Sequence, residues 1–247
     1  MIYKDILNAP HTLIGGTTGS GKSVLMNGVI TSFIENVPID KAYMILIDPK
    51  KVEFSIYADC ENCAAYADEL PAIIAVLDSA IEVIGERYDW MKQNHMRKFP
   101  GREVYIFIDE LADLMISAKA KDIKVKLQKI LQIGRAAGVH IIAATQAPNR
   151  KVIPAELVLN FTDRIALRCL SAIESRQLIN APGAESLPRY GKAIYMSPAG
   201  YQTVDIPFIS DAIAESVAAK HSKPRRTESV FGNVIRGLFK NSRFARA

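Results

Sequence analysis

The chain has 247 residues, of which 49% are hydrophobic and 23% charged, and its formal net charge is +5. This composition is typical of a folded protein and excludes a disordered or collagen-like chain. No run of about 18 apolar residues is present, so the sequence predicts no membrane-spanning helix, and its start lacks the features of a signal peptide. Three cysteines are an odd number, which excludes a fully paired disulfide framework. We therefore expect a cytoplasmic protein with reduced thiols.

The positive charge is concentrated at the C-terminus. Residues 220–247 contain eight Lys and Arg side chains against one acid, Glu228, an excess larger than the +5 of the whole chain. The preceding part is therefore slightly acidic, and any DNA-binding surface on it has to be local. We expect one domain over residues 1–219 and a basic tail over residues 220–247.

Short β-branched runs alternate with longer amphipathic stretches, which is typical of strand–helix–strand units on a parallel sheet. The pattern predicts an α/β fold with a mostly parallel central sheet flanked by helices. In chain order we expect a strand at Thr12–Gly15, a helix at 22–36, a strand at Tyr43–Asp48, a helix at 71–95, a strand at Val104–Asp109, a helix at 121–137 stopped by Gly138, and strands at His140–Thr145, Arg164–Cys169, Lys192–Met196 and Gln202–Ile206.

The segment GTTGSGKS at Gly16–Ser23 matches the pattern of a phosphate-binding P-loop, between an expected strand and an expected helix. Its glycines let backbone N–H groups face phosphates, and a helix N-terminus favours negative charge. We expect Lys22 to reach the β- and γ-phosphates of ATP and Ser23 to ligate Mg²⁺. The expected nucleotide-binding residues are Gly16, Thr17, Thr18, Gly19, Ser20, Gly21, Lys22 and Ser23.

Two acids follow the apolar strand that ends at Ile108. Asp109 suits a Walker B carboxylate that holds Mg²⁺ at the C-terminal edge of the sheet. Glu110 is placed to polarise an attacking water. The alternative is an N-cap pair that starts the next helix. Gln146 ends the following buried strand, where a polar side chain can sense a γ-phosphate.

The order of these and further segments closely resembles the FtsK/SpoIIIE family of double-stranded DNA translocases over roughly residues 10–210. The resemblance implies a RecA-like motor core that forms a hexameric ring around DNA and moves it with ATP, and nucleotide held between subunits. The segments that carry it are GGTTGSGKS at 15–23, IDPK at 47–50, IDELADLM at 108–115, IGRAAGVHIIAATQ at 133–146, DRIALRCLSAIESR at 163–176 and GAESL at 183–187.

The resemblance also implies an arginine supplied in trans by a neighbouring subunit. Arg164 is our first candidate, because it lies in a stretch like the family's TRIAF, and Arg176 is the second. The alternative for both is a surface ion pair, which commonly contributes little.

Two segments depart from the family where pore loops are expected. Ala147 replaces the arginine of ATQRP, and Lys192 replaces the aspartate of the GxGDML loop. Sequence-tolerant DNA tracking needs only cations that face phosphates. The candidates are Arg150, Lys151, Arg189 and Lys192, with solvated loop charges as the alternative.

Two further features have more than one interpretation. Cys60 and Cys63 have zinc-like spacing but lack a second pair of ligands, which favours an ordinary pair flanking a helix.

Residues 229–240 of the tail form an amphipathic pattern that could bind a protein, DNA or an anionic membrane surface, or pack on the body.

The sequence therefore predicts an ATP- and Mg²⁺-dependent ATPase that moves duplex DNA as a homo-oligomer, with a hexamer expected. One rival is a conjugation or packaging motor acting on single-stranded DNA or nucleoprotein. The other is an assembly scaffold gated by nucleotide, in which hydrolysis only resets binding.

Overall fold

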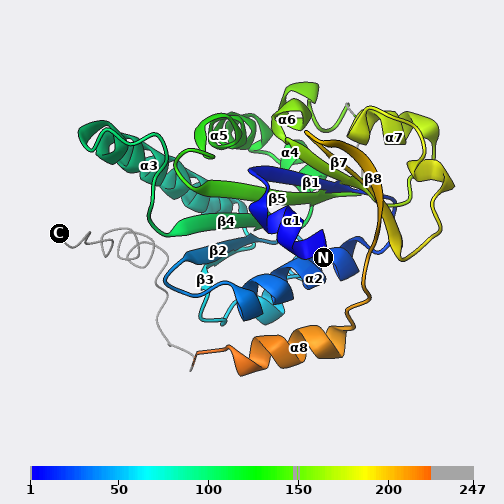
Figure 1. Ribbon diagram of the computed structural model, residues 1–247, viewed down its shortest axis with the longest axis horizontal. Coiled ribbons are helices and arrows are strands. Elements are labelled where there is room, and N and C mark those ends of the chain that lie inside the picture. Colours follow the sequence, from blue (N-terminus) through cyan, green and yellow to red (C-terminus); the bar gives the residue numbers. More distant parts are fainter. Residues whose placement is uncertain (1, 147–148, 150, 224–247) are drawn as a thin grey trace.

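A computed structural model describes residues 2–146, 149 and 151–223, and contains one eight-stranded sheet (Figure 1). The tail beyond residue 223, with its expected amphipathic helix, lies outside the described residues. The strand order is β3-β2-β4-β5-β1-β6-β7-β8. The strands are β1 His11–Gly15, β2 Ala42–Ile47, β3 Cys63–Ala67, β4 Glu103–Ile108, β5 Val139–Thr145, β6 Asp163–Ala166, β7 Lys192–Ser197 and β8 Gly200–Asp205.

The six strands β1 to β6 run parallel, whereas β7 is antiparallel to β6 and forms a hairpin with β8. The expected α/β class with a mostly parallel sheet is confirmed. The central strands are buried on both faces, because apolar side chains alternate between two cores. On β2, for example, Ile45 and Ile47 face one core and Met44 and Leu46 the other.

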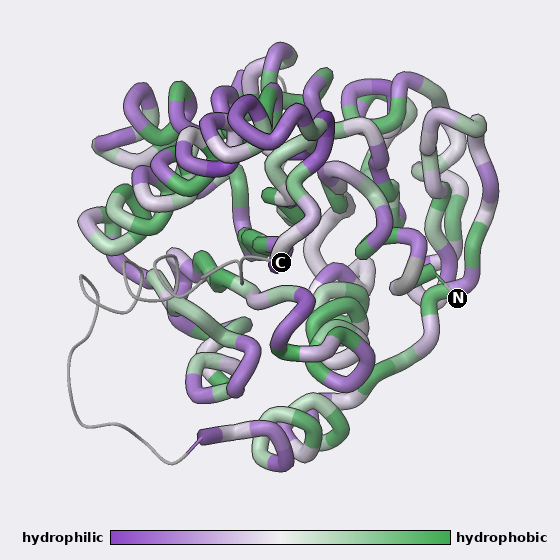
Figure 2. The backbone as a smooth tube through the Cα atoms, turned by 60° about the vertical axis from the view of Figure 1, so that its left-hand side comes forward, coloured by the Kyte–Doolittle hydropathy of each residue, from purple (hydrophilic) through white to green (hydrophobic). Residues whose placement is uncertain are grey.

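Helices cover both faces of the sheet (Figure 1). One face packs against α3, α4, α5, α6 and α7, and the other against α1, α2 and α8. In Figure 2 the helical turns alternate between hydrophilic and hydrophobic colours, as amphipathic surface helices should. The helices are α1 Ile2–Asn8, α2 Lys22–Asn36, α3 Leu70–Gln93, α4 Leu111–Ile116, α5 Ala120–Ile133, α6 Ala155–Asn160, α7 Ala172–Ile179 and α8 Asp211–Lys220. Within the described part of the chain, no helix combines the length and apolar character needed to cross a bilayer.

Two local expectations are wrong. Cys63 opens β3, so the cysteine pair precedes a strand and does not flank a helix. The helix expected to continue to residue 137 ends at Ile133, because residues 134–138 form a turn that leads into β5. A Cβ on Gly134 would lie 2.6 Å from the carbonyl oxygens of both Ile130 and Val139. Gly138 follows in this turn with φ 66°, immediately before β5.

The sheet order places three strand ends side by side. β1 lies between β5 and β6, and β4 lies next to β5. Because these strands are parallel, their carboxyl ends meet at one edge, where parallel sheets generally bind ligands. The P-loop after β1, the two acids after β4 and Gln146 after β5 therefore meet there.

Candidate nucleotide site

The P-loop connects β1 to α2 with two left-handed glycines, Gly19 (φ 74°) and Gly21 (φ 96°). A residue with a Cβ would be strained in either conformation. Gly16 is needed for space, because a Cβ there would lie 2.7 Å from the Cβ of Leu167. The loop is thus held close to the chain that follows β6.

Lys22 is almost fully buried and points at the end of β4. Its Nζ donates to the carbonyl oxygen of Asp109 at 3.1 Å and to Oε2 of Glu110 at 3.2 Å. The same Nζ lies 3.7 Å from Oδ1 of Asp109. The charge of Lys22 is therefore neutralised by the chain's own carboxylates.

Besides its expected role with the attacking water, the Glu110 carboxylate accepts hydrogen bonds from two backbone amides. Its side chain caps α4 by accepting from the amide of Ala112 at 3.3 Å, and it accepts from the amide of Gln146 at 3.0 and 3.1 Å. Lys50, from the IDPK segment, lies 3.9 Å from its Oε2. The N-cap interpretation is thus correct for Glu110, and the same carboxylate also contacts the P-loop lysine.

Asp109 is 1% exposed, and neither of its carboxylate oxygens has a hydrogen-bond partner among the described residues. Burial raises its pKa to about 6; Lys22 opposes that shift, and the carboxylates of Glu53, Asp48 and Glu110 add to it. A buried carboxylate without donors is costly unless a cation pairs with it. Asp109 thus has the free oxygens and the burial that a hard divalent cation requires.

Two hydroxyls of the P-loop point at the surrounding polar groups. Oγ1 of Thr18 donates to Oε1 of Gln146 at 2.8 Å, which joins the loop to the end of β5. Oγ of Ser23 donates to Oε1 of Glu53 at 2.9 Å. The residues expected at the phosphates, the metal and the γ-phosphate sensor therefore lie together in the structure.

An apolar cavity of about 450 Å³ opens beside the P-loop. Its walls come from four separate parts of the chain, so no continuous sequence motif predicts it. Tyr190 and Phe208 are 59% and 75% exposed. Aromatic residues in loops carry no periodic signal, so nothing in the sequence alone links them to the nucleotide. The lining residues are Ser20, Gly21, Val24, Leu167, Tyr190, Gly191, Ile206 and Phe208.

The two arginines expected to act in trans have different environments. Arg164 is buried, and its guanidinium donates to the carbonyl oxygens of Phe161 at 3.1 Å and Leu178 at 3.2 Å. Arg176 is exposed on α7, which follows β6 at the edge that holds the P-loop. A guanidinium bonded within its own chain is not available to a neighbour, so the structure favours Arg176 over Arg164.

Among the expected DNA-contacting cations that the structure describes, Arg189 and Lys192 have different partners. Nε of Arg189 lies 3.5 Å from the carbonyl oxygen of Gly19 in the P-loop, whereas Nζ of Lys192 pairs with Asp205 across the β7–β8 hairpin at 2.7 Å. Lys151 is exposed after β5, and Arg150 lies outside the described residues. The side chains of Arg189 and Lys192 therefore contact groups of their own chain, Gly19 and Asp205.

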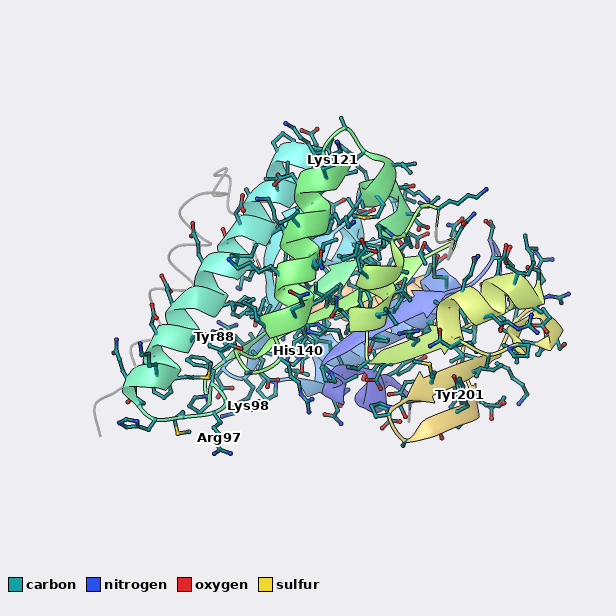
Figure 3. The ribbon with its side chains drawn as sticks, turned by 90° about the horizontal axis from the view of Figure 1, so that it is seen from above. Tyr88, Arg97, Lys98, Lys121, His140 and Tyr201 are labelled. Atoms are coloured by element: carbon teal, nitrogen blue, oxygen red, sulfur yellow. The ribbon has the colours of Figure 1, made fainter. Side chains whose placement is uncertain are left out.

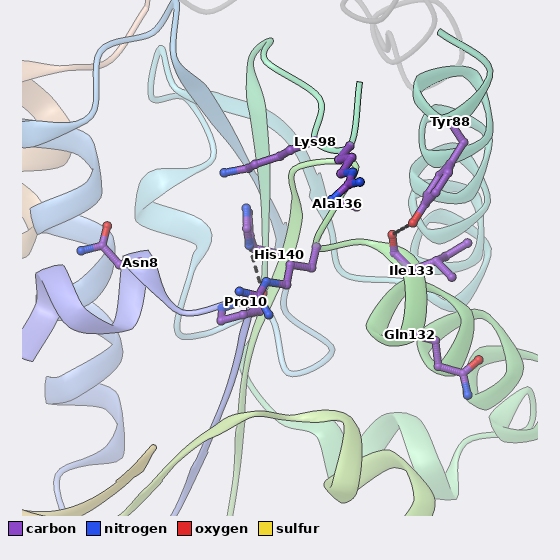
Figure 4. A pocket seen from close by; sticks show the side chains of 10 residues that line it. Asn8, Pro10, Tyr88, Lys98, Gln132, Ile133, Ala136 and His140 are labelled. Carbon is purple, nitrogen blue, oxygen red and sulfur yellow. Dashed lines mark hydrogen bonds between the residues drawn. The ribbon is translucent and has the colours of Figure 1, made fainter. Parts of the chain in front are cut away.

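A second cavity, of about 470 Å³, lies at the opposite edge of the sheet. Figure 3 shows Tyr88, Arg97, Lys98 and His140 grouped at the end of α5 that is far from Lys121. Figure 4 shows two contacts at this cavity: the hydroxyl of Tyr88 donates to the carbonyl oxygen of Ile133 at 3.1 Å, and Nδ1 of His140 lies 3.0 Å from the carbonyl oxygen of Pro10. Arg135 also lines this cavity, so three exposed cations surround it.

The chain is similar in sequence to known proteins. The family model described as FtsK/SpoIIIE family matches residues 1–105 and 100–150. The DNA translocase FtsK of Rhizobium meliloti (strain 1021) is 33% identical over 263 residues, covering 88% of this chain and 30% of the relative. The DNA translocase FtsK of Helicobacter pylori (strain J99) is 34% identical over 223 residues, covering 84% and 26%. The chain thus spans less than a third of the length of these relatives.

Solved structures show the same fold. The monomer form of the pCW3 conjugation coupling protein TcpA with ATPγS matches with a TM-score of 0.76 at 21% identity, over 87% of this chain and 66% of that one. ATPases 2 and 3 of EssC from Geobacillus thermodenitrificans match with a TM-score of 0.75 at 16% identity, over 92% and 49%. From the matching family model and the curated relatives, the chain belongs to the FtsK/SpoIIIE family.

Proposed function

We propose that this chain is an ATPase motor domain that moves double-stranded DNA as a homo-oligomeric ring, with a hexamer as the expected assembly. The observation that carries the proposal is the buried cluster of Lys22, Asp109 and Glu110 at one sheet edge, with the exposed Gln146 bonded to Glu110 through its amide. These are the parts that phosphoryl transfer to water needs: a cation on the phosphates, a metal-binding carboxylate, a base and a polar sensor. The relatives named DNA translocase supply the proposed cargo.

Nucleotide binding would redistribute the charges around Lys22. Its Nζ is bonded to Glu110. Phosphate oxygens would compete for the same ammonium group and draw it away, which leaves the Glu110 carboxylate free to orient a water and accept its proton. Gln146, at the end of β5, is hydrogen-bonded to Thr18 of the P-loop and is therefore placed to sense a bound γ-phosphate.

Ser23 and Asp109 are the residues that would hold Mg²⁺. When bound, Mg²⁺ would neutralise the charge that develops on the phosphates. Asp109 offers two free oxygens for this purpose. Within the described residues no three His, Cys, Asp or Glu side chains are close enough to form a metal site by themselves. That fits Mg²⁺, which is commonly bound by one or two protein groups together with phosphates and water.

The 450 Å³ cavity is the proposed site of the adenine base. It adjoins Ser20 and Gly21 of the P-loop, and its other walls are apolar or aromatic. Nucleotide-sized pockets are typically apolar with a few polar groups. Tyr190 and Phe208 offer exposed rings on which a base can stack.

The cation supplied in trans should lie on a face other than the chain's own P-loop edge. In a ring, the contact between copies is heterologous, so each nucleotide edge meets a different face of the next copy. The 470 Å³ cavity at the opposite edge presents Arg97, Lys98 and Arg135, of which only Lys98 has a carboxylate partner among the described residues. We therefore propose Arg135, with Arg97 as second choice, and prefer both to Arg176.

Mixing two inactive variants tests this arrangement. Lys22→Ala removes a chain's own site, and Arg135→Ala removes the cation it gives to its neighbour. In mixed rings some interfaces combine an intact site with an intact arginine, so ATP hydrolysis should partly return. Arg176→Ala serves as the matched control and should remain active. No recovery on mixing, with rings still assembled by sedimentation, would show that Arg135 does not act in trans.

Displacement of a third strand from a triplex tests movement along DNA and separates the rivals. A motor on duplex DNA should displace the strand only with hydrolysable ATP. Stimulation of hydrolysis by single-stranded but not duplex DNA would favour the conjugation or packaging motor. Hydrolysis without displacement or DNA stimulation would favour the scaffold.

For the contact with DNA we propose Lys151, with Arg150 next to it in the sequence. Lys151→Ala should lower the salt dependence of DNA binding.

A further inference from the structure

The hydroxyl of Ser23 donates a hydrogen bond to a carboxylate that is not part of the expected metal site. Its Oγ donates to Oε1 of Glu53 at 2.9 Å, although Asp109 is the carboxylate expected beside it. Glu53 lies in the loop after β2, three positions beyond Lys50, and is half-buried. This loop thus reaches across to the start of α2 and contacts a residue that would bind the cation.

A second observation concerns two buried carboxylates, each with at least one oxygen that has no hydrogen-bond partner among the described residues. Asp109 is 1% exposed, and neither carboxylate oxygen accepts a hydrogen bond within the described residues. Asp48, at the end of β2, is also fully buried and has one oxygen, Oδ1, without a hydrogen-bond partner there. Such groups require a positive partner besides Lys22, whose Nζ is shared with Glu110.

A hydroxyl has one hydrogen and two lone pairs. With its hydrogen given to Glu53, Ser23 has both lone pairs left for a cation, and rotation about its Cα–Cβ bond is restrained. The same bond prevents the hydroxyl from donating to Asp109, so the Asp109 oxygens stay free. Groups that orient metal ligands in this way commonly affect metal affinity by about 10- to 100-fold.

We propose that Glu53 is a positioning residue for Mg²⁺: it holds the Ser23 hydroxyl in the orientation that leaves its lone pairs available to the ion. Glu53 acts through Ser23 and is not itself a metal ligand. The proposal rests on the ATPase function proposed above, because Mg²⁺ is bound there together with nucleotide.

The test is a double-mutant cycle read by nucleotide binding, with no turnover required. Fluorescent mant-ADP binding to the full chain is measured against Mg²⁺ concentration for the wild type, Glu53→Ala, Ser23→Ala and the double variant. Glu53→Ala should raise the half-saturating Mg²⁺ concentration about 10-fold and leave binding in EDTA unchanged. In the Ser23→Ala background the same change should have little further effect, because the residue through which Glu53 acts is gone.

Two further variants separate positioning from charge and from folding. Glu53→Gln keeps an acceptor for the hydroxyl and should therefore stay much closer to the wild type than Glu53→Ala. Glu61→Ala, an exposed acid whose side chain has no hydrogen bond or ion pair in the described part of the chain, is the matched control and should change nothing. Thermal melting confirms that each variant is folded.

The outcomes are distinct. Equal effects of Glu53→Ala with and without Ser23, or a Glu53→Gln variant as impaired as Glu53→Ala, would overturn the positioning role and leave the ATPase proposal intact. Unchanged Mg²⁺ dependence in Glu53→Ala would do the same. Failure of the wild type to bind nucleotide with or without Mg²⁺ would overturn the ATPase proposal and this inference with it.

Discussion

Glu110 shows how one side chain can combine folding and chemistry. It caps α4, accepts from the amide of Gln146 and pairs with Lys22, all while 2% exposed. The carboxylate is therefore fixed by contacts from three separate parts of the chain. Preorganisation of this kind is what a general base needs, since no reorientation is required at the moment of reaction.

The first prediction concerns Glu110→Gln. The amide keeps an oxygen that can accept from Ala112 and Gln146, so the fold and nucleotide binding should be retained. It cannot take a proton, and the rate of hydrolysis should fall about 10²- to 10⁴-fold. Single-turnover hydrolysis and mant-nucleotide affinity measure the two effects separately. A hydrolysis rate equal to the wild type would exclude Glu110 as the base.

At the scale of elements, the turn between α5 and β5 depends on backbone space. Gly134 has two carbonyl oxygens 2.6 Å from where its Cβ would be, and these belong to the helix that ends and the strand that begins there. Gly85, inside α3, has nothing within 4 Å of such a Cβ. Lack of space therefore requires glycine at position 134, whereas position 85 has room for a side chain.

The second prediction compares alanine at these two positions. Gly134→Ala should destabilise the fold by about 1–3 kcal/mol, because neither backbone oxygen can move without shifting α5 or β5. Gly85→Ala should stabilise it by about 0.5–1 kcal/mol, because alanine loses less backbone entropy in a helix. Urea denaturation measures both. A Gly134→Ala protein as stable as the wild type would contradict the assigned turn.

The third prediction concerns pH and β1. Burial, together with His140 and Arg135, lowers the pKa of His11 from 6.5 to about 3. Its Nδ1 accepts from the amide of Ile141, which a proton on that nitrogen would prevent. Between these values the unfolded chain binds a proton that the folded chain does not, so stability falls as the pH falls. The slope from this group approaches about 1.36 kcal/mol per pH unit.

Between pH 6.5 and 5 the carboxyl of Asp109, whose pKa burial raises to about 6, contributes with the opposite sign, so the contribution of His11 is the difference in slope between the wild type and a His11 variant. Glu103, whose pKa is lowered to about 2 chiefly by its contact with His140, contributes its own loss only below about pH 4.5. His11→Asn keeps an acceptor for Ile141 and should remove the contribution of His11 from the dependence of the urea midpoint on pH. His95→Asn, at an exposed position, should leave it unchanged. An unaltered slope in His11→Asn would show that His11 titrates normally.

The sequence was informative where the signal is local and continuous. The P-loop residues and the acids after β4 could be predicted, because their types are dictated by phosphate and metal chemistry and their strands are buried on both faces. Tyr190, Phe208 and Glu53 could not, since their roles arise only when distant loops meet. Arg164 was chosen from a linear match, yet its guanidinium is bonded within its own chain.

At the scale of the whole molecule, the sheet separates two charged edges. The carboxyl ends of the strands hold the P-loop and its acids, and the opposite edge carries the cavity with Arg97, Lys98 and Arg135. A heterologous ring would bring these edges of successive copies together. The slightly acidic body is then consistent with local cationic surfaces for nucleotide and DNA.

The most direct measurement is steady-state ATP hydrolysis by the full chain with and without linear duplex DNA, at a stated salt concentration. We expect several-fold stimulation by duplex DNA that exceeds that by single strands, and loss of hydrolysis in Glu110→Gln with nucleotide binding retained. Turnover that ignores every form of DNA, or that persists in Glu110→Gln, would contradict the proposed motor.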